Sequence, residues 1–228
     1  MKRNRWEQLA PLTGVLAVAV IVIAVVIGGS TPDVKDSAAK VLSFYAKHRD
    51  TEMNAAFMIG IGAAIFLLFA TTLRHALAQR SPSARLANAS FAGGIVAAGG
   101  ILLTAALQLA LADSAKYGDA TVTHTLNILS GDTFLPMSAG TGVMVLTASA
   151  SAWRTAALPK WLAVIGVVAG VATFTPVGFP AFLVCLVWIV ATSIALALAK
   201  PRPAVEIPGQ AAASMLSDPA ALALPPQR

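Results

Sequence analysis

The chain has 228 residues, of which 57% are hydrophobic and 11% are charged. A soluble domain carries about 25% charged residues, so this composition and the mean hydropathy of +0.76 exclude an ordinary soluble protein and a largely disordered one. The formal net charge of +6 is therefore not by itself a sign of nucleic-acid binding.

Six segments are long and apolar enough to be predicted as membrane spans, each of which needs about 20 residues. The uncharged stretch 161–199 holds two of them, because Pro176, Gly178 and Pro180 end a helix and turn the chain. A backbone in hydrocarbon must satisfy its own polar groups, so the spans are helices. The prediction is an all-α polytopic membrane protein, a bundle of six transmembrane helices within 9–199, at 9–27, 53–73, 88–111, 134–153, 158–174 and 181–199.

Lysine and arginine predict the orientation of these spans. With the N-terminus inside, 11 basic residues lie on the cytoplasmic side and 5 on the outer side, so both termini are assigned to the cytoplasm. Residues 1–8 then form a cytoplasmic N-terminus, and 200–228, which contain six prolines, form a disordered cytoplasmic tail. The alternative is a signal peptide cleaved near Gly28, which would leave five spans and an outside N-terminus.

Two outer segments are predicted to form short amphipathic helices. In the first, the triplet Thr31-Pro32-Asp33 is a helix-start signal, and apolar residues follow at helical spacing up to Tyr45. This helix lies on the membrane surface or caps the bundle. The second follows Asp119, and Gly131-Asp132-Thr133 is predicted to start the fourth span.

Small residues recur at helical spacing in several spans and allow helices to approach closely. They are the pair Gly166 and Gly170, the stripe at residues 56, 60 and 64, and the stripe at residues 89, 93, 97 and 100. Packing within one chain is favoured over a dimer interface.

Gln108 is the most polar side chain deep in a predicted span and the only candidate binding residue. One interpretation is a hydrogen bond to another helix, with Ser138, Thr141 or Thr192 as its partner. The other is a contact with a substrate, because buried polar groups in membranes are often functional.

Two histidines and five of the acids on the outer segments are candidate ligands, namely His48, Asp50, Glu52, Asp113, Asp119, His124 and Asp132. A carboxylate–imidazole metal site is one interpretation. A wet loop surface in which Asp50 and Asp132 cap helices is favoured, because the spacing matches no metal motif. No metal and no cofactor is predicted.

The core of none of the predicted spans contains Asp, Glu, Lys, Arg or His. Proton relays, ion pumps and voltage sensors depend on such groups in the membrane, and the sequence also lacks a phosphate-binding loop or an HExxH motif. We therefore expect no enzymatic activity.

The segment Leu158-Pro159-Lys160-Trp161-Leu162, followed by Gly166 and Gly170, resembles a segment of small bacterial six-helix membrane proteins grouped as a domain of unknown function and common in actinobacteria. The resemblance extends loosely over 53–199. It implies an architecture and no catalytic residues. The 47 alanines also fit a high-GC bacterium, so we expect a bacterial plasma membrane.

Two functional classes follow. The first is a non-enzymatic accessory or structural protein that binds lipid or another membrane protein. The second is a small transporter or channel for a neutral or apolar solute, with a cavity near Gln108 lined by Ser138, Thr141 and Thr147.

Overall fold

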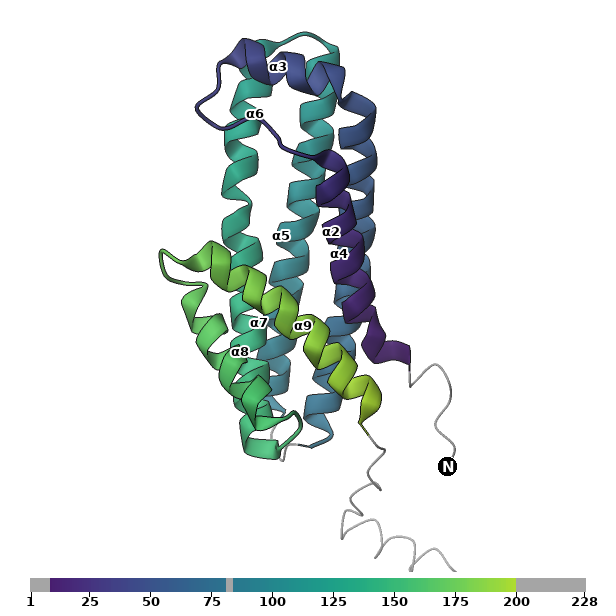
Figure 1. Cartoon of the computed structure of the whole chain (residues 1–228), viewed down its shortest axis with the longest axis vertical. Helices are drawn as coiled ribbons and strands as arrows, with labels where there is room; N and C mark the ends of the chain where they lie inside the picture. The colour runs from purple at the N-terminus through teal and green to yellow at the C-terminus, as the bar shows by residue number, and fades with distance from the viewer. Residues whose placement is uncertain (1–8, 81–83, 200–228) are drawn as a thin grey trace, which may run out of the picture. The chain divides into compact units, whose positions relative to one another are not determined.

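The computed structural model describes residues 9–80 and 84–199; the predicted N-terminus at 1–8 and tail at 200–228 lie outside these residues. Every regular element in the described part is a helix (Figure 1). In chain order they are η1 (Ala10–Leu12), α2 (Thr13–Gly28), α3 (Ala38–Lys47), α4 (Arg49–Ala78), α5 (Arg85–Lys116), α6 (Ala120–Asp132), α7 (Phe134–Thr155), α8 (Lys160–Ala172) and α9 (Gly178–Leu198).

Five helices of the described residues are long and apolar enough to cross a membrane, so the predicted count of six is not confirmed. They are Ala10–Gly28, Arg49–Ala78, Arg85–Lys116, Ala120–Thr155 and Gly178–Leu198. The predicted span 158–174 corresponds to α8, which has 13 helical residues and rises about 20 Å. A hydrocarbon core is about 30 Å thick.

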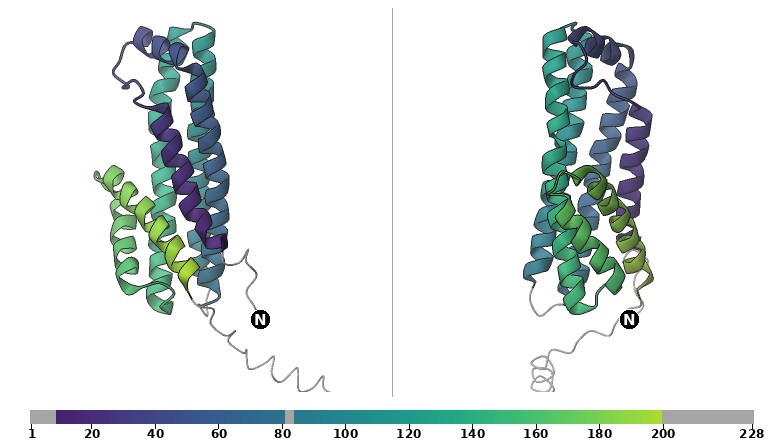
Figure 2. Two further views of the ribbon diagram at one scale, coloured as in Figure 1. Left: turned by 45° about the vertical axis from the view of Figure 1, so that its right-hand side comes forward. Right: turned by 60° about the vertical axis from the view of Figure 1, so that its left-hand side comes forward.

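α8 is short because the chain turns before the helix can continue. Thr173 donates its hydroxyl hydrogen to the carbonyl of Gly170, and the residue before Pro176 is disfavoured in a helix. The chain reverses into α9, and the two helices form a hairpin beside α7 (Figure 2). Trp188 of α9 closes this hairpin with a 2.8 Å hydrogen bond from its indole Nε1 to the carbonyl of Leu162 in α8.

This hydrogen bond gives the first prediction. Trp188 is 1% exposed, so the Trp188→Phe variant is expected to lose about 1–3 kcal/mol of unfolding free energy, because it removes a buried donor and leaves part of a cavity. Thermal unfolding in detergent measures the loss. Trp161→Phe, at a side chain that is 60% exposed, is the matched control, and an equal loss in both variants would contradict the assignment.

Glycines bring α5 and α7 close together through the middle of the bundle. A Cβ atom on Gly93 would lie 2.5 Å from the backbone nitrogen of Met144, and one on Gly100 would lie 2.6 Å from that of Met137. A Cβ on Gly140 would collide with the backbone of α5 in the same way. The predicted role of the small residues at 93, 97 and 100 in packing within the chain is therefore confirmed.

The other two small-residue predictions have different outcomes. Gly166 and Gly170 of α8 pack against α7, and Gly166 also meets Trp188 of α9, as predicted. The stripe at residues 56, 60 and 64 does not pack as a unit, because Gly60 has no neighbour within reach of a Cβ and Ala64 is exposed. The inward face of α4 instead includes Ala56, Ala63 and Phe66, which are all buried.

One end of the bundle, called here the α3 end, is covered by α3, which lies across it (Figure 1). Val41 and Tyr45 of α3 form a small apolar cluster with Leu111 and Ala115 of α5. The predicted helix start at residues 31–33 is wrong, because α3 begins at Ala38 after a cap in which Ser37 accepts from the Lys40 backbone N–H.

α6 and α7 continue each other almost without a break. Asp119 caps α6 by accepting a hydrogen bond from the Val122 backbone N–H. The predicted start of a span at Gly131-Asp132-Thr133 is not a chain break, because Thr133 keeps a helical backbone. The two helices together form one apolar segment of 36 residues.

Candidate functional site

Glu52 is the most unusual side chain of the described structure. The sequence places it in a wet loop before the span at 53–73, but α4 already begins at Arg49 and turns Glu52 inward. The residue is 0% exposed, and neither carboxyl oxygen has a hydrogen-bond partner among the described residues. The prediction that Glu52 belongs to a solvated surface is therefore wrong.

The C-terminal end of α2 packs directly against this carboxyl group. A Cβ atom on Gly28, the last residue of α2, would lie 3.7 Å from each carboxyl oxygen of Glu52 and 3.7 Å from the Cβ of Ala55. These are ordinary packing distances. Both oxygens are so fully enclosed that no water-sized space touches them.

Tyr45 of α3 lies close enough to Glu52 for the two groups to interact electrostatically. Burial, and then the negative charge of Glu52, raises the pKa of the Tyr45 hydroxyl. That hydroxyl donates to Asn127 Oδ1 of α6 at 3.3 Å, and Asn127 Nδ2 donates to the carbonyl of Pro32 at 3.4 Å. The one hydrogen that Tyr45 can donate is thus used by Asn127 and not by Glu52.

His48 stands between α3 and α4, one helical turn before Glu52. Its Nδ1 lies 3.0 Å from the carbonyl of Phe44, which can only accept, so Nδ1 carries the hydrogen and Nε2 is the free nitrogen. The imidazole also stacks on the ring of Phe44, with centroids 4.6 Å apart. His48 interacts electrostatically with the Glu52 carboxyl group.

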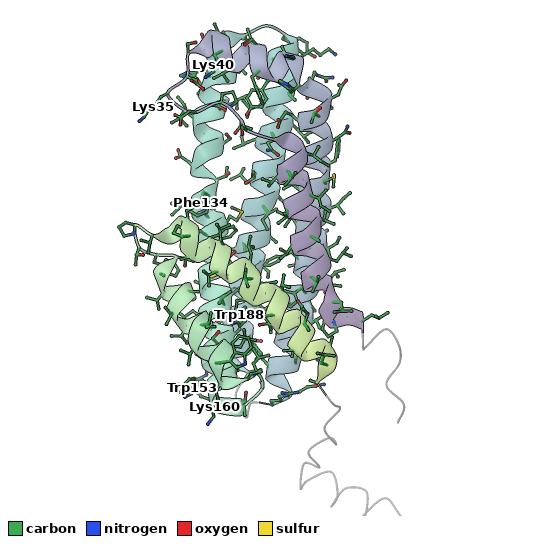
Figure 3. All side chains as sticks on the ribbon, in the orientation of Figure 1. Lys35, Lys40, Phe134, Trp153, Lys160 and Trp188 are labelled. Atoms are coloured by element: carbon green, nitrogen blue, oxygen red, sulfur yellow. The ribbon has the colours of Figure 1, made fainter. Side chains whose placement is uncertain are left out.

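His48 also lines a hollow of about 480 Å³ between α3 and the chain that precedes it. Lys40, Lys47 and Asp36 lie around this hollow, and Figure 3 shows Lys40 at the α3 end. Lys40 and Asp36 form a 2.8 Å ion pair, whose hydrogen bond holds the pKa of Asp36 below its usual value. The hollow therefore has one unshared cation, Lys47, beside the imidazole in the described part.

Arg49 and Asp113 tie α4 to α5 at the same end. Arg49 Nη2 donates to Asp113 Oδ1 at 3.0 Å, while Arg49 Nε is buried without a partner among the described residues. This pair joins two antiparallel helices near the α3 end. Gln108 Oε1 is also buried without a partner within the described chain.

The predicted hydrogen bond from Gln108 to another helix does not form. Ser138 and Thr141 donate to carbonyls of their own helix, at 3.1 Å from Leu135 O and 2.8 Å from Met137 O. Thr192 Oγ1 has no partner in the part of the chain that the structure describes. Hydroxyl groups in helices commonly bond back to the preceding turn, which competes with contacts across helices.

The predicted solute cavity is not assembled by these residues either. Thr147 donates to the carbonyl of Val143 in its own helix. The hollow at α3 is bordered by none of the four residues Gln108, Ser138, Thr141 and Thr147, and an apolar groove of about 400 Å³ along α8 and α9 is bordered by none of them. Tight packing of α5 on α7 fills the region between them.

The acids and histidines of the α3 end do not gather as metal ligands: the described residues contain no group of three that could hold a metal ion. Asp50 and Asp132 are not caps. Asp50 lies in the first turn of α4 with a 94% exposed side chain, and α4 has no side-chain cap. Asp132 ends α6, and no side chain caps α7.

Sequence reasoning missed Glu52 because hydropathy starts a span at its first apolar residue. The signal was present in the spacing, since residues 52, 56, 59 and 63 share one face of a helix. An acid at the first of these positions, followed by Ala56, Ile59 and Ala63, predicts a carboxyl group on the buried face once the helix is extended by one turn.

No protein-family model, curated protein or solved structure was found to match this chain. The geometry of the described residues therefore carries the functional argument.

Proposed function

We propose that this chain is a non-enzymatic, multi-pass protein of a bacterial plasma membrane that binds an acidic segment of another membrane protein at its α3 end. Its apolar helices are compatible with a membrane protein. The distribution of basic residues in the sequence supports cytoplasmic termini, so the α3 end faces outward.

The observation that carries this proposal is the closed middle of the bundle. α5 and α7 approach so closely at Gly93, Gly100 and Gly140 that no side chain larger than hydrogen fits there. A carrier of neutral solutes needs a cavity near the middle of the membrane. Close packing favours a protein that acts through its surface.

The α3 end supplies the surface. The hollow beside α3 is open, and Lys47 and His48 border it next to the Lys40–Asp36 pair. An acidic segment would complement this basic border. The hollow lies at the surface and does not enclose a substrate for a reaction. This supports a role in binding a partner.

The test is native mass spectrometry of the full-length protein, gently extracted from its own membrane. We expect a second protein at a defined stoichiometry, lost in the Lys47→Glu variant and kept in Lys160→Glu, a matched charge reversal at the other end of the bundle (Figure 3). Loss in both variants, or in neither, would overturn the assignment of the surface.

The transporter alternative has its own readout. Liposomes containing the purified protein are expected to shrink and reswell in glycerol or urea at the rate of protein-free liposomes. A faster rate that a Gln108→Leu substitution abolishes would replace the binding proposal with a solute pathway.

A further inference from the structure

We propose that Glu52 is a proton-binding site that exchanges its proton with the hollow at the α3 end through His48. This inference does not rest on the binding of a partner. It starts from the burial of the carboxyl group and from its lack of donors.

The enclosure of the Glu52 carboxyl group limits the size of the ligand that it can bind. Neither oxygen of Glu52 touches a water-sized space. A metal ion, an amine or a water molecule would need room that this packing does not leave. A proton needs none, and it removes the charge whose burial without a partner would be costly.

The charged groups of the described residues leave the Glu52 carboxyl group without a permanent counterion. α2 contributes no titratable residue, and from α3 Tyr45 directs its hydroxyl to Asn127. On α4, Arg49 reaches away to Asp113 of α5. His48 is the group that remains, and it interacts electrostatically with Glu52.

His48 is placed to pass the proton between the hollow and the buried carboxyl group of Glu52. Its Nδ1 hydrogen is held by the Phe44 carbonyl, so Nε2 is the atom that exchanges. Nε2 takes a proton from water in the hollow and forms an imidazolium. The imidazolium then releases one proton to a Glu52 oxygen, which restores a neutral ring and a neutral carboxylic acid. A histidine ring nitrogen can both accept and release a proton, which suits it to this exchange.

The transfer requires a movement at the α3 end, because no hydrogen bond joins His48 to Glu52 in the described arrangement. The C-terminal end of α2 is the element that moves. Gly28 lies beside the carboxyl group, and the next residue, Gly29, has a φ of 71°, which a glycine adopts without strain. Loss of the proton therefore favours separation of Gly28 from Glu52.

Infrared spectroscopy of the full-length protein in liposomes tests the site. We expect a protonated-carboxyl carbonyl band at neutral pH that is absent in the near-isosteric variant Glu52→Gln and retained in Asp113→Asn. A wild-type spectrum that equals that of Glu52→Gln would overturn the proposal.

The route is tested by transfer into heavy water. The shift of the Glu52 band on deuteration is expected to slow by roughly 100-fold in His48→Gln, the size of effect that a positioned acid–base group gives. Lys47→Gln, in the same hollow, is the matched control and should exchange at the wild-type rate. An unchanged rate in His48→Gln would overturn the assignment of His48.

Discussion

Replacing Gly140 with leucine is expected to prevent α5 and α7 from packing, with a loss of about 3 kcal/mol or more in unfolding free energy. The Cβ atom of the new side chain would collide with the backbone of α5 at Ala97 and at Gly93. Backbone atoms cannot rotate away as a side chain can, so the helices must separate. Thermal unfolding followed by size-exclusion chromatography in detergent measures the loss.

Gly99→Leu is the matched control for this change. Gly99 lies within α5 and has nothing within reach of a Cβ atom. Both substitutions gain the higher helix propensity of leucine, so the difference between them isolates the collision. Equal stability of the two variants would show that α5 and α7 do not approach as closely as described.

Replacing Glu52 with methionine is expected to stabilise the protein by about 1–3 kcal/mol, although it alters a fully buried residue. Methionine fills a similar volume, and it removes two oxygens that have no donor among the described residues. The same change abolishes the proposed proton site, so the variant should be more stable and unable to show the carboxyl band.

Asp50→Asn provides the comparison, because its side chain is 94% exposed and a change there should stay within about 0.5 kcal/mol. Chemical or thermal unfolding of both variants in the same detergent measures the difference. A Glu52→Met variant less stable than the wild type would mean that the carboxyl group has a stabilising partner in the folded protein.

The all-helical class and the general positions of the long apolar helices could be predicted, because an uncharged apolar stretch of about 20 residues is typical of a membrane-spanning helix. The number of spans could not. Composition treats 158–174 as apolar throughout, whereas the helix ends at Ala172 because of the turn around Pro176. Hydropathy counts apolar residues and does not detect where backbone hydrogen bonding stops.

The candidate site was predicted less well than the fold. Gln108 was identified as buried and polar, and its Oε1 atom is indeed enclosed, but the partner depended on helix rotation that a sequence does not specify. The hydroxyl groups of Ser138 and Thr141 donate to carbonyls of their own helix and therefore do not donate to Gln108. Glu52 was assigned to solvent because the extra turn of α4, from Arg49 to Glu52, is polar in composition.

The meeting of α2 with α9 has a consequence for the order of biosynthesis. Gly14 of α2 fits between Phe69 of α4 and Ser193 of α9. A ribosome completes α2 long before α9. The newly made α2 must therefore remain in the bilayer without one of the helices against which it packs. Helices that are stable singly in lipid tolerate this delay, and the arrival of α9 becomes the step that completes the tertiary structure.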